Sequence, residues 1–198
     1  MTTPGTAGYG SQAAELAVRY ESISFEDVHR DVLHLLPATP ASFADIGAGT
    51  GRDAAALARR GHRVVAVEPT PEMRAAGQQI HAAADIEWID DSLPALANLR
   101  RLSRRFDVIM MTAVWMHLDA AERACAMEAI AALLAERGMV FMTLRHGPVP
   151  AGRRMFDVSA ADTGALAEQF GLRVIHDSQR GCMLGQAGVN WSHLVLGR

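Results

Sequence analysis

Short apolar runs alternate along most of the chain with longer stretches that have helical periodicity. The apolar runs are typical of strands buried in a sheet, and they lie at Ser42–Ile46, Arg63–Val67, Ile86–Ile89, Phe106–Met111 and Met139–Leu144. The helical stretches between them lie at Asp53–Arg60, Pro71–Ala84, Ala95–Arg104 and Asp119–Glu136. Strands joined by helices in this way form right-handed βαβ units with parallel strands. The pattern therefore predicts an α/β fold with helices on both faces of a sheet.

Local signals mark the ends of two of these helices. Thr70 stands before Pro71, which predicts a helix that begins with proline and is capped by the threonine hydroxyl. Gly138 follows Arg137 and predicts the end of the helix before the fifth strand.

The chain before the first strand has a different pattern. The first ten residues are rich in Gly and Thr, and we expect them to be mobile. One helical face follows, formed by Ala13, Leu16, Ala17 and Tyr20. Ser24 and Asp27 then resemble a capping box and predict a helix that continues to Leu36. We therefore predict a helical N-terminal segment over residues 1–40, ahead of a core domain over residues 41–198.

The end of the chain breaks the alternation of strands and helices. A helix is predicted near Ala160–Phe170, and strands are predicted near Leu172–Asp177 and Val189–Leu196. The turn-rich segment Gly181–Gly188 joins these two strands, which predicts an antiparallel hairpin at the edge of the sheet.

Composition narrows the class of protein. The chain has 198 residues, of which 49% are hydrophobic, and this is enough for the core of one domain. The formal net charge of −3 argues against nucleic acid as a partner, because its phosphates attract basic proteins. No lysine is present, which removes Schiff-base and P-loop lysine chemistry. Cys125 and Cys182 are too few for a disulfide framework, and we expect them to be free and buried.

Other signals concern location and metals. No apolar run approaches the roughly 18 residues that cross a membrane, and the first ten residues lack the pattern of a signal peptide. The histidines show no spacing typical of metal ligands. We therefore expect a cytoplasmic protein that binds no metal and no membrane.

The most informative motif lies at the end of the first strand. Gly47, Gly49 and Gly51 follow Asp45 in the spacing G-x-G-x-G, just before a predicted helix. A glycine turn between strand and helix lets a ligand approach the backbone at the positive end of the helix. A P-loop is excluded because no Lys-Ser/Thr pair follows. A dinucleotide fingerprint would need its third glycine where Arg52 stands.

Glu68 closes the second strand, 21 residues after Gly47. Its carboxylate is suited to accept hydrogen bonds from both hydroxyls of a ribose. Nicotinamide-dependent enzymes also have such a carboxylate, so Glu68 leaves a dehydrogenase-like nucleotide fold open as an alternative.

Three motifs, taken in order, resemble the class I S-adenosylmethionine-dependent methyltransferases: Asp45–Gly51, Val67–Pro69 and Asp90–Pro94. The resemblance extends over about Tyr20–Leu144. It implies a Rossmann-like, doubly wound sheet of seven strands, mostly parallel with an antiparallel C-terminal strand. It also implies S-adenosylmethionine as the cofactor. The antiparallel end agrees with the hairpin that the tail predicts by itself.

By resemblance, each motif has a part of the cofactor to bind. The glycine loop would lie against the methionine part, and Glu68 would hold the ribose. Pro69 would lie along the adenine. Either Asp91 or Asp90 would take the adenine amino group, and Ser92 would offer a backbone N–H. The full set of cofactor candidates is Tyr20, Asp45, Gly47, Ala48, Gly49, Gly51, Arg52, Glu68, Pro69, Asp90, Asp91, Ser92 and Ala113.

Tyr20 lies in the N-terminal segment, which in this family often folds over the cofactor as a lid. A tyrosine at this position would touch the methionine part of the cofactor or only pack the lid. His29 and His34 follow it, and we expect both at the surface or in the lid.

Methyl transfer is a displacement at a sulfonium, so the protein mainly orients and desolvates the reactants and sometimes supplies a base. His117 comes just after the fourth strand, where it would act as a general base or only pack the loop and cap the next helix. Trp115 would face the sulfonium or fill the core. Arg145 and His146, after the fifth strand, are candidates for contact with the substrate.

Two groups of arginines have different expected roles. Arg153 and Arg154 lie in the loop after the fifth strand and would bind a carboxylate or phosphate, or simply be exposed. The other group precedes the fourth strand and consists of Arg100, Arg101, Arg104 and Arg105. We expect this group at the amino ends of the strands, as a solvated helix end.

The chain leaves no room for a recognition domain beside the core. It also lacks the Asn/Asp-Pro-Pro-aromatic motif of enzymes that methylate amino groups on adenine or glutamine. We therefore predict an S-adenosylmethionine-dependent methyltransferase that acts on oxygen, nitrogen, sulfur or carbon of a small molecule. The alternatives are an S-adenosylmethionine-binding protein with other chemistry or none and, more remotely, a nicotinamide-dependent oxidoreductase.

Overall fold

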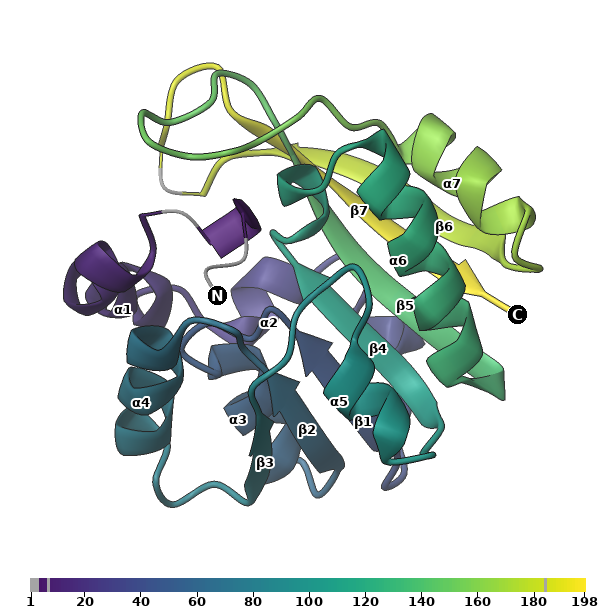
Figure 1. Cartoon of the computed structure of the whole chain (residues 1–198), viewed down its shortest axis with the longest axis horizontal. Helices are drawn as coiled ribbons and strands as arrows, with labels where there is room; N and C mark the ends of the chain where they lie inside the picture. Colours follow the sequence, from purple (N-terminus) through teal and green to yellow (C-terminus); the bar gives the residue numbers. More distant parts are fainter. Residues whose placement is uncertain (1–3, 7, 184) are drawn as a thin grey trace.

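The structure, a computed structural model that describes residues 4–6, 8–183 and 185–198, is built around a seven-stranded sheet (Figure 1). The strands are β1 (Ser42–Ile46), β2 (Arg63–Val67), β3 (Ile86–Ile89), β4 (Phe106–Thr112), β5 (Leu134–His146), β6 (Arg173–Gly181) and β7 (Asn190–Gly197). Their order is β3-β2-β1-β4-β5-β7-β6. β7 runs antiparallel to β5 and β6, and the other neighbouring pairs are parallel. The predicted sheet and its terminal hairpin are confirmed.

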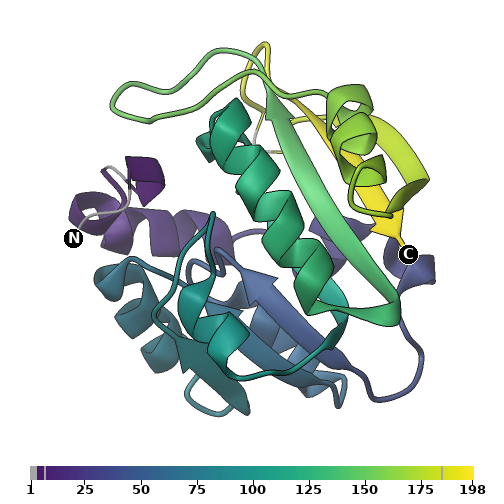
Figure 2. The same ribbon diagram turned by 45° about the vertical axis from the view of Figure 1, so that its right-hand side comes forward.

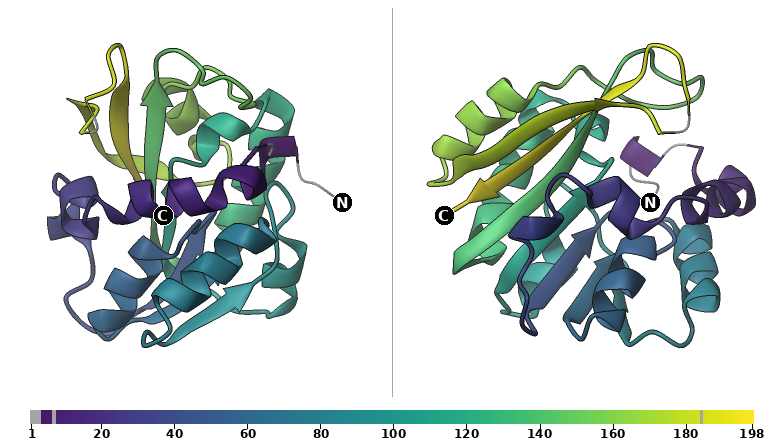
Figure 3. Two further views of the ribbon diagram at one scale, coloured as in Figure 1. Left: turned by 90° about the vertical axis from the view of Figure 1, so that its left-hand side faces the viewer. Right: turned by 180° about the vertical axis from the view of Figure 1, so that it is seen from behind.

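Helices cover both faces of this sheet. They are α1 (Ala13–Glu21), α2 (Phe25–His29), α3 (Arg52–Arg59), α4 (Pro71–Ile80), α5 (Ala97–Arg101), α6 (Ala120–Leu133) and α7 (Ala160–Glu168). Figures 1 and 3 show α5, α6 and α7 on one face, with α3 and the N-terminal helices toward the other. The fold is thus doubly wound, as the sequence predicts.

β4 shows why the strands read as continuous apolar runs. Successive side chains of a strand point to opposite faces of the sheet. Ile109 and Met111 pack in the core under α5 and α6, and Val108 and Met110 pack in the core under α2 and α3. All four side chains are buried. Because both faces are covered, polar residues have no place in the middle of the strand.

The junction between α6 and β5 differs from the prediction. α6 ends at Leu133 and β5 begins at the next residue, so Gly138 lies inside the strand and is not a helix stop. A Cβ at Gly138 would lie 2.6 Å from the Leu134 side chain and 3.0 Å from the Phe106 carbonyl oxygen. The glycine is therefore explained by close packing at the irregular start of β5, where the pairing register shifts.

The N-terminal segment also contains less helix than expected. Ser24 caps α2 by accepting a hydrogen bond from the Asp27 N–H (3.0 Å), but α2 ends at His29 and only a 3-10 turn, Leu33–Leu35, follows. His29 is 2% exposed, and its Nε2 lies 2.8 Å from Oδ2 of Asp53 in α3. His29 is expected at the surface or in a lid. The surface position is wrong, because the ring is buried and paired with Asp53.

The first ten residues are described in part. Residues 1–3 and 7 lie outside the described residues, and residues 4–6 and 8–10 form 3-10 helix and turns. Tyr9 is half-buried and hydrogen-bonded to His117. The expectation of a mobile segment does not hold for Tyr9.

Three further expectations concern caps and cysteines. Pro71 is the first residue of α4, as predicted, but the Thr70 hydroxyl makes no capping hydrogen bond. The Thr70 N–H instead donates to Glu68 (2.8 Å). Cys125 is exposed and Cys182 is half-buried, so the expected burial of both cysteines is wrong.

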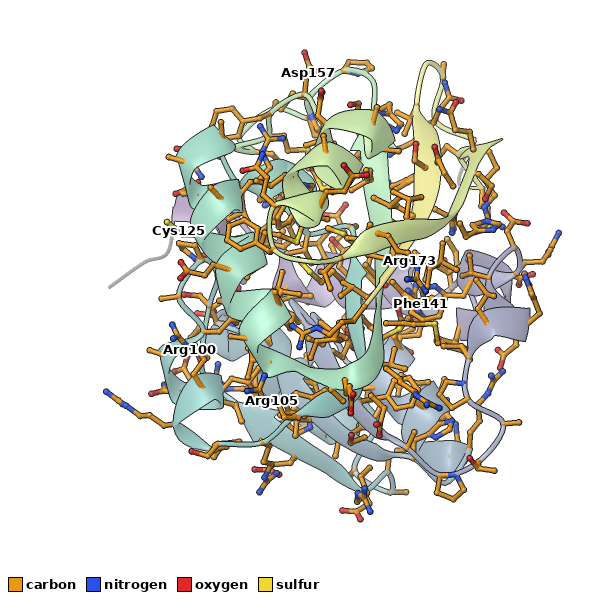
Figure 4. All side chains as sticks on the ribbon, turned by 90° about the vertical axis from the view of Figure 1, so that its right-hand side faces the viewer. Arg100, Arg105, Cys125, Phe141, Asp157 and Arg173 are labelled. Carbon is orange, nitrogen blue, oxygen red and sulfur yellow. The ribbon has the colours of Figure 1, made fainter. Side chains whose placement is uncertain are left out.

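The arginines before β4 lie where the sequence places them. Figure 4 shows Arg100 and Arg105 in the half of the molecule away from Asp157. All four arginines of this group are exposed, and Arg105 directly precedes β4. The prediction of a solvated helix end at the amino ends of the strands is confirmed.

Gly77 of α4 gives a test of how tightly α4 packs on the glycine loop. A Cβ at Gly77 would lie 2.5 Å from the Trp88 ring and 2.6 Å from the Thr50 carbonyl oxygen. Because this backbone has no room to yield, Gly77→Ala should lower the free energy of unfolding by about 1–3 kcal/mol, despite the higher helix propensity of alanine. In Gly164→Ala, the matched control in α7, the new methyl group meets only the exposed side chain of Val174. Urea unfolding compares the two, and equal stability would contradict the packing argument.

Candidate functional site

A cavity of about 530 Å³ lies at the carboxyl ends of the parallel strands. Its walls come from the loops after β1 to β5, from the β6–β7 hairpin and from the N-terminal segment. Figure 2 shows α1, in purple, beside α4 at this end of the molecule, where Ala13, Leu16 and Met73 form a small apolar cluster. Ligands of open parallel sheets bind at this end of the strands. The cavity is therefore the candidate functional site.

The turn between β1 and α3 brings backbone to the edge of the cavity. Gly47, Gly49 and Gly51 have positive φ angles of 72°, 58° and 78°, a region that side chains disfavour. A Cβ at Gly47 would lie 2.5 Å from the Val114 side chain, and one at Gly51 would lie 2.6 Å from the Trp88 ring. Glycine is therefore needed for both conformation and space. Gly47 and Gly49 line the cavity, and Gly51 stands at the start of α3 without lining it.

Glu68 is a buried carboxylate at the end of β2. It is 6% exposed and lines the cavity. Its two oxygens accept hydrogen bonds from the N–H groups of Gly49 and Thr70, both at 2.8 Å. Burial raises the pKa of Glu68, and the two N–H groups hold the carboxyl group in place. The side chain therefore fixes the glycine loop relative to the loop after β2.

Of the two aspartates after β3, Asp91 lines the cavity and Asp90 does not. The Asp91 carboxylate accepts hydrogen bonds from the N–H groups of Ser92 and Leu99, both at 2.8 Å. The Asp90 side chain is 69% exposed and forms an ion pair with Arg74 (3.1 Å). The sequence leaves open which of the two aspartates would contact the adenine. Their positions favour Asp91, because it lines the cavity and Asp90 does not.

A second buried carboxylate, Asp53, joins four parts of the chain. It accepts hydrogen bonds from Thr112 Oγ1 (2.7 Å), His29 Nε2 (2.8 Å) and Arg52 Nε (2.7 Å). Arg52 also donates to the Tyr20 carbonyl oxygen (3.3 Å). Although burial opposes ionisation, His29 and Arg52 lower the pKa of Asp53. The anion therefore connects α1, α2, α3 and β4 beside the cavity.

Asp45 lies next to this network and lines the cavity. Burial, followed by the nearby Asp53, raises the pKa of Asp45 well above its ordinary range. Its Oδ2 atom is buried and has no hydrogen-bond partner among the described residues. A buried polar atom without a partner costs free energy unless a ligand or water satisfies it. Asp45 is therefore placed to receive a donor group from a ligand.

His117 follows β4 in a 3-10 turn and lines the cavity. Its Nδ1 lies 2.8 Å from the Arg154 carbonyl oxygen, and its Nε2 lies 3.1 Å from the Tyr9 hydroxyl. Because a carbonyl oxygen only accepts, Nδ1 carries the proton of the neutral ring and Nε2 accepts from Tyr9. Burial lowers the pKa of His117, which favours this neutral form.

Tyr9 is a cavity residue that the sequence reasoning missed. Burial raises the pKa of its phenol, so the hydroxyl stays protonated at neutral pH and donates to His117. The Arg153 guanidinium lies 4.0 Å from the centre of its ring. The only signal in the sequence is an aromatic residue within a Gly-rich stretch, and that pattern does not identify a partner.

Ala113 and Trp115 occupy different places near His117. Ala113 lines the cavity with a φ of 59°, and its N–H donates to Thr143 Oγ1 (2.8 Å). This conformation costs about 1–3 kcal/mol for a residue other than glycine, so it marks a strained loop at the site. Trp115 is completely buried outside the cavity. The sequence leaves open whether Trp115 faces the sulfonium or fills the core. In the structure it lies in the core.

Of the residues expected near the substrate, some line the cavity and others do not. Arg145 lines the cavity, but His146 does not, and its Nε2 lies 2.8 Å from Ser192 Oγ. Arg153 also lines the cavity. Arg154 instead forms ion pairs with acidic residues at the start of α6, Asp119 (3.0 Å) and Glu122 (2.7 Å).

The cavity thus brings together most of the residues singled out from the sequence. Those that line it are Tyr20, Asp45, Gly47, Ala48, Gly49, Arg52, Glu68, Pro69, Asp91, Ser92, Ala113, His117 and Arg145. Those that do not line it are Gly51, Asp90, Trp115 and His146. Besides Tyr9, the sequence reasoning missed His193 of β7, which lines the cavity with 2% of its surface exposed.

Residues 4–6, 8–183 and 185–198 contain neither a cluster of metal ligands nor a membrane-spanning helix. No group of three or more His, Cys, Asp or Glu side chains in this part of the chain is arranged to hold a metal ion. None of the helices in it is long and apolar enough to cross a membrane.

Comparison with known proteins finds one family that matches the central part of the chain. Residues 43–138 match the family described as a methyltransferase domain. This range contains the glycine loop, Glu68, Asp91 and His117. No curated protein matches the chain in sequence.

Solved structures with the same fold include three methyltransferases. The magnesium protoporphyrin IX methyltransferase from Synechocystis, with bound S-adenosylmethionine, is 14% identical with a TM-score of 0.68, over 96% of this chain and 84% of that chain. The TehB-like S-adenosylmethionine-dependent methyltransferase from Corynebacterium glutamicum is 20% identical with a TM-score of 0.66, and the match covers 93% of this chain and 97% of that chain. The 1,6-didemethyltoxoflavin-N1-methyltransferase from Burkholderia thailandensis is 21% identical with a TM-score of 0.63, and the match covers 100% of this chain and 91% of that chain. At these identities the likeness is one of fold.

The Asp53 network predicts a large loss of stability when its charge is removed. Asp53→Asn removes the buried anion that accepts from the buried His29 and the half-buried Arg52, and should lower the free energy of unfolding at pH 7 by about 3–5 kcal/mol. Because the folded pKa of Asp53 is below its ordinary value of 3.8, this stabilisation is present above pH 3.8 and is lost as the pH falls below it.

The control for this experiment is Asp27→Asn, which removes an exposed ion pair with Arg30. Such pairs contribute little, so urea unfolding should leave this variant close to the unsubstituted protein. An Asp53→Asn variant as stable as Asp27→Asn would contradict the role given to the network.

Proposed function

We propose that this chain is a class I S-adenosylmethionine-dependent methyltransferase, as the matching family and the shared fold support, and that it transfers the methyl group to a small-molecule nucleophile bound in the cavity. The observation that carries the proposal is that two sets of residues line one cavity. One set is the glycine loop with the carboxyl groups of Glu68 and Asp91, and the other contains His117 and Arg145.

The acidic part of the cavity fits the cofactor. S-Adenosylmethionine carries a sulfonium, an amino group and ribose hydroxyls, which favour carboxylates and other acceptors. The unpartnered Oδ2 of Asp45 and the held carboxyl group of Glu68 supply such acceptors. We assign the glycine loop to the methionine part, Glu68 to the ribose, and Asp91 with Ser92 to the adenine.

The bound cofactor supplies an electrophilic methyl group, so the chain mainly orients the acceptor and manages its proton. His117 is suited to take that proton at Nε2, because its Nδ1–H is held by the Arg154 carbonyl oxygen. Nε2 now accepts from the Tyr9 hydroxyl. An acceptor that donates an O–H or N–H to Nε2 would take the place of this phenol.

The N-terminal segment, which we placed at residues 1–40, would act as a lid on the core. Its residues Tyr9 and Tyr20 line the cavity. Gln12 Oε1 accepts a hydrogen bond from Arg153 Nη2 (2.5 Å) in the loop after β5. Together with the His29–Asp53 pair, these contacts hold the segment beside the cavity, where it would restrict the access of water to the reacting groups.

A small acceptor agrees with the size of the cavity and with the net charge. The Synechocystis and Burkholderia thailandensis neighbours are described as methyltransferases of magnesium protoporphyrin IX and of 1,6-didemethyltoxoflavin, which are both small molecules. A nucleic-acid substrate would instead favour a basic surface, and the chain has a formal net charge of −3.

Incubation of a cell extract with the enzyme and methyl-labelled cofactor tests the acceptor class. Mass spectrometry should find the label in a small molecule. Label in bulk tRNA or DNA, together with strong retention of the protein on heparin, would overturn this part of the proposal.

Glu68→Ala should weaken binding of S-adenosylhomocysteine by about 1–3 kcal/mol, because ribose hydroxyls lose a buried acceptor. Glu87→Ala, which alters an exposed glutamate of β3 that pairs with Arg104, is the control and should bind normally. Calorimetric titration measures both. Equal affinity in the two variants would remove Glu68 from the cofactor site.

His117→Ala should lower kcat by about 10²–10⁴ while affinity for the cofactor stays nearly unchanged. Because the pKa of His117 lies below its ordinary value of 6.5, kcat/KM of the unsubstituted enzyme should rise with pH below 6.5 and be flat above it. His34→Ala, at an exposed histidine, should keep both the rate and the pH profile.

Two outcomes would change the assignment of His117. Loss of both rate and cofactor binding, with a lower melting temperature, would mark the residue as structural. Full activity in His117→Ala would mean that orientation alone drives the transfer.

A further inference from the structure

Three antiparallel strands form one wall of the cavity, away from the glycine loop. Arg145 of β5 and Arg180 of β6 are both paired with Trp191 of β7. Two residues further along β7, His193 is paired with Thr143 of β5. Directly paired residues, and residues two apart on one strand, share a face of the sheet. All five of these residues line the cavity.

The two arginines of this wall have different partners. Arg180 donates through Nη2 to the carbonyl oxygens of Asp27 (2.6 Å) and Val28 (2.8 Å), and its Nη1 lies 3.9 Å from Asp31 Oδ2. It therefore holds the N-terminal segment against β6. Arg145 has no comparable contact with a carboxylate among the described residues.

Arg145 is held by backbone alone. Its Nη1 donates to the carbonyl oxygens of Gly147 (3.4 Å) and Pro148 (2.9 Å). Among the described residues, none with a carboxyl group forms an ion pair with it. The guanidinium is thus positioned with its remaining N–H groups available, and a carboxylate is the partner that matches its planar set of donors.

His193 adds a second, neutral donor to the wall. Burial and the nearby Arg180 lower its pKa to about 4, so the ring is uncharged at neutral pH. Its Nδ1 is enclosed without a hydrogen-bond partner among the described residues. An enclosed lone pair costs less than an enclosed N–H, so we place the proton on Nε2. The ring therefore offers an N–H donor to a ligand.

We propose that this wall binds the methyl acceptor as a planar aromatic carboxylate, with the carboxylate on Arg145, the ring against Trp191 and a second acceptor atom on His193. The inference rests on the proposed function and deepens it, since it gives the substrate class of the same cavity. An indole side chain suits an aromatic ring because it offers a large apolar face. The anion is also separated from Glu68 and Asp91, which line the cofactor part.

The test uses two probes of the same shape, 2-naphthoate and its uncharged amide, 2-naphthamide. Each is titrated by calorimetry into enzyme saturated with S-adenosylhomocysteine. The naphthoate should bind at least about tenfold more tightly than the amide, since a charge-assisted hydrogen bond is lost in the amide. Arg145→Gln should abolish this preference and leave affinity for S-adenosylhomocysteine unchanged.

Two further variants complete the design. Arg137→Gln removes an exposed arginine from the other end of β5 and should keep the full preference for naphthoate. His193→Phe keeps a ring at that position without a donor, and should weaken naphthoate binding by about three- to tenfold.

The proposal is overturned if both probes bind equally or not at all to the unsubstituted enzyme, or if the preference survives in Arg145→Gln. Naphthoate affinity that is unchanged in His193→Phe would overturn the part given to that residue. Failure of S-adenosylhomocysteine to bind would instead contradict the cofactor assignment. The same two probes titrated into the free enzyme would then still decide the question of the wall.

Discussion

The buried Asp53 carboxylate is the interaction on which the shape of the cavity most depends. It binds Arg52 at the start of α3, Thr112 at the end of β4 and His29 at the end of α2. These three elements come from separate parts of the sequence, and none of them forms a closed wall alone. Because the anion is buried, its three donors cannot leave without a large loss of free energy. The N-terminal segment is thereby fixed over the carboxyl ends of the strands.

The two kinds of strand pairing in the sheet give the cavity its two chemical characters. Each of the parallel strands β1 to β3 is followed by a loop and then a helix. These loops contain the glycines, Glu68 and Asp91. After β4, the strained Ala113 leads to His117. The antiparallel strands β5, β7 and β6 instead present side chains from their faces, including Arg145 and His193. Under the proposed function, the first set would accept hydrogen bonds from the cofactor, and the second would donate to the methyl acceptor.

Much of this architecture could be predicted from the sequence, because the signals for it are local. Strands buried on both faces leave continuous apolar runs, and the glycine loop leaves its spacing. What escaped prediction depends on contacts between distant residues. The role of Gly138 follows from packing against Leu134 and Phe106. Tyr9 meets His117 across more than half of the chain. No periodicity or spacing records such a pair, and the placement of Asp91 rather than Asp90 in the cavity likewise depends on the folded loop.

Parallel calorimetric titrations of the unsubstituted protein with S-adenosylhomocysteine and with NADH test the central claim most directly. Both ligands contain an adenosine whose ribose would suit Glu68, so this residue alone does not separate them. The rest of the loop does, because Arg52 stands where a dinucleotide fingerprint needs a glycine. S-Adenosylhomocysteine should bind, and NADH should give no heat of binding. Binding of NADH without any response to S-adenosylhomocysteine or S-adenosylmethionine would contradict the account.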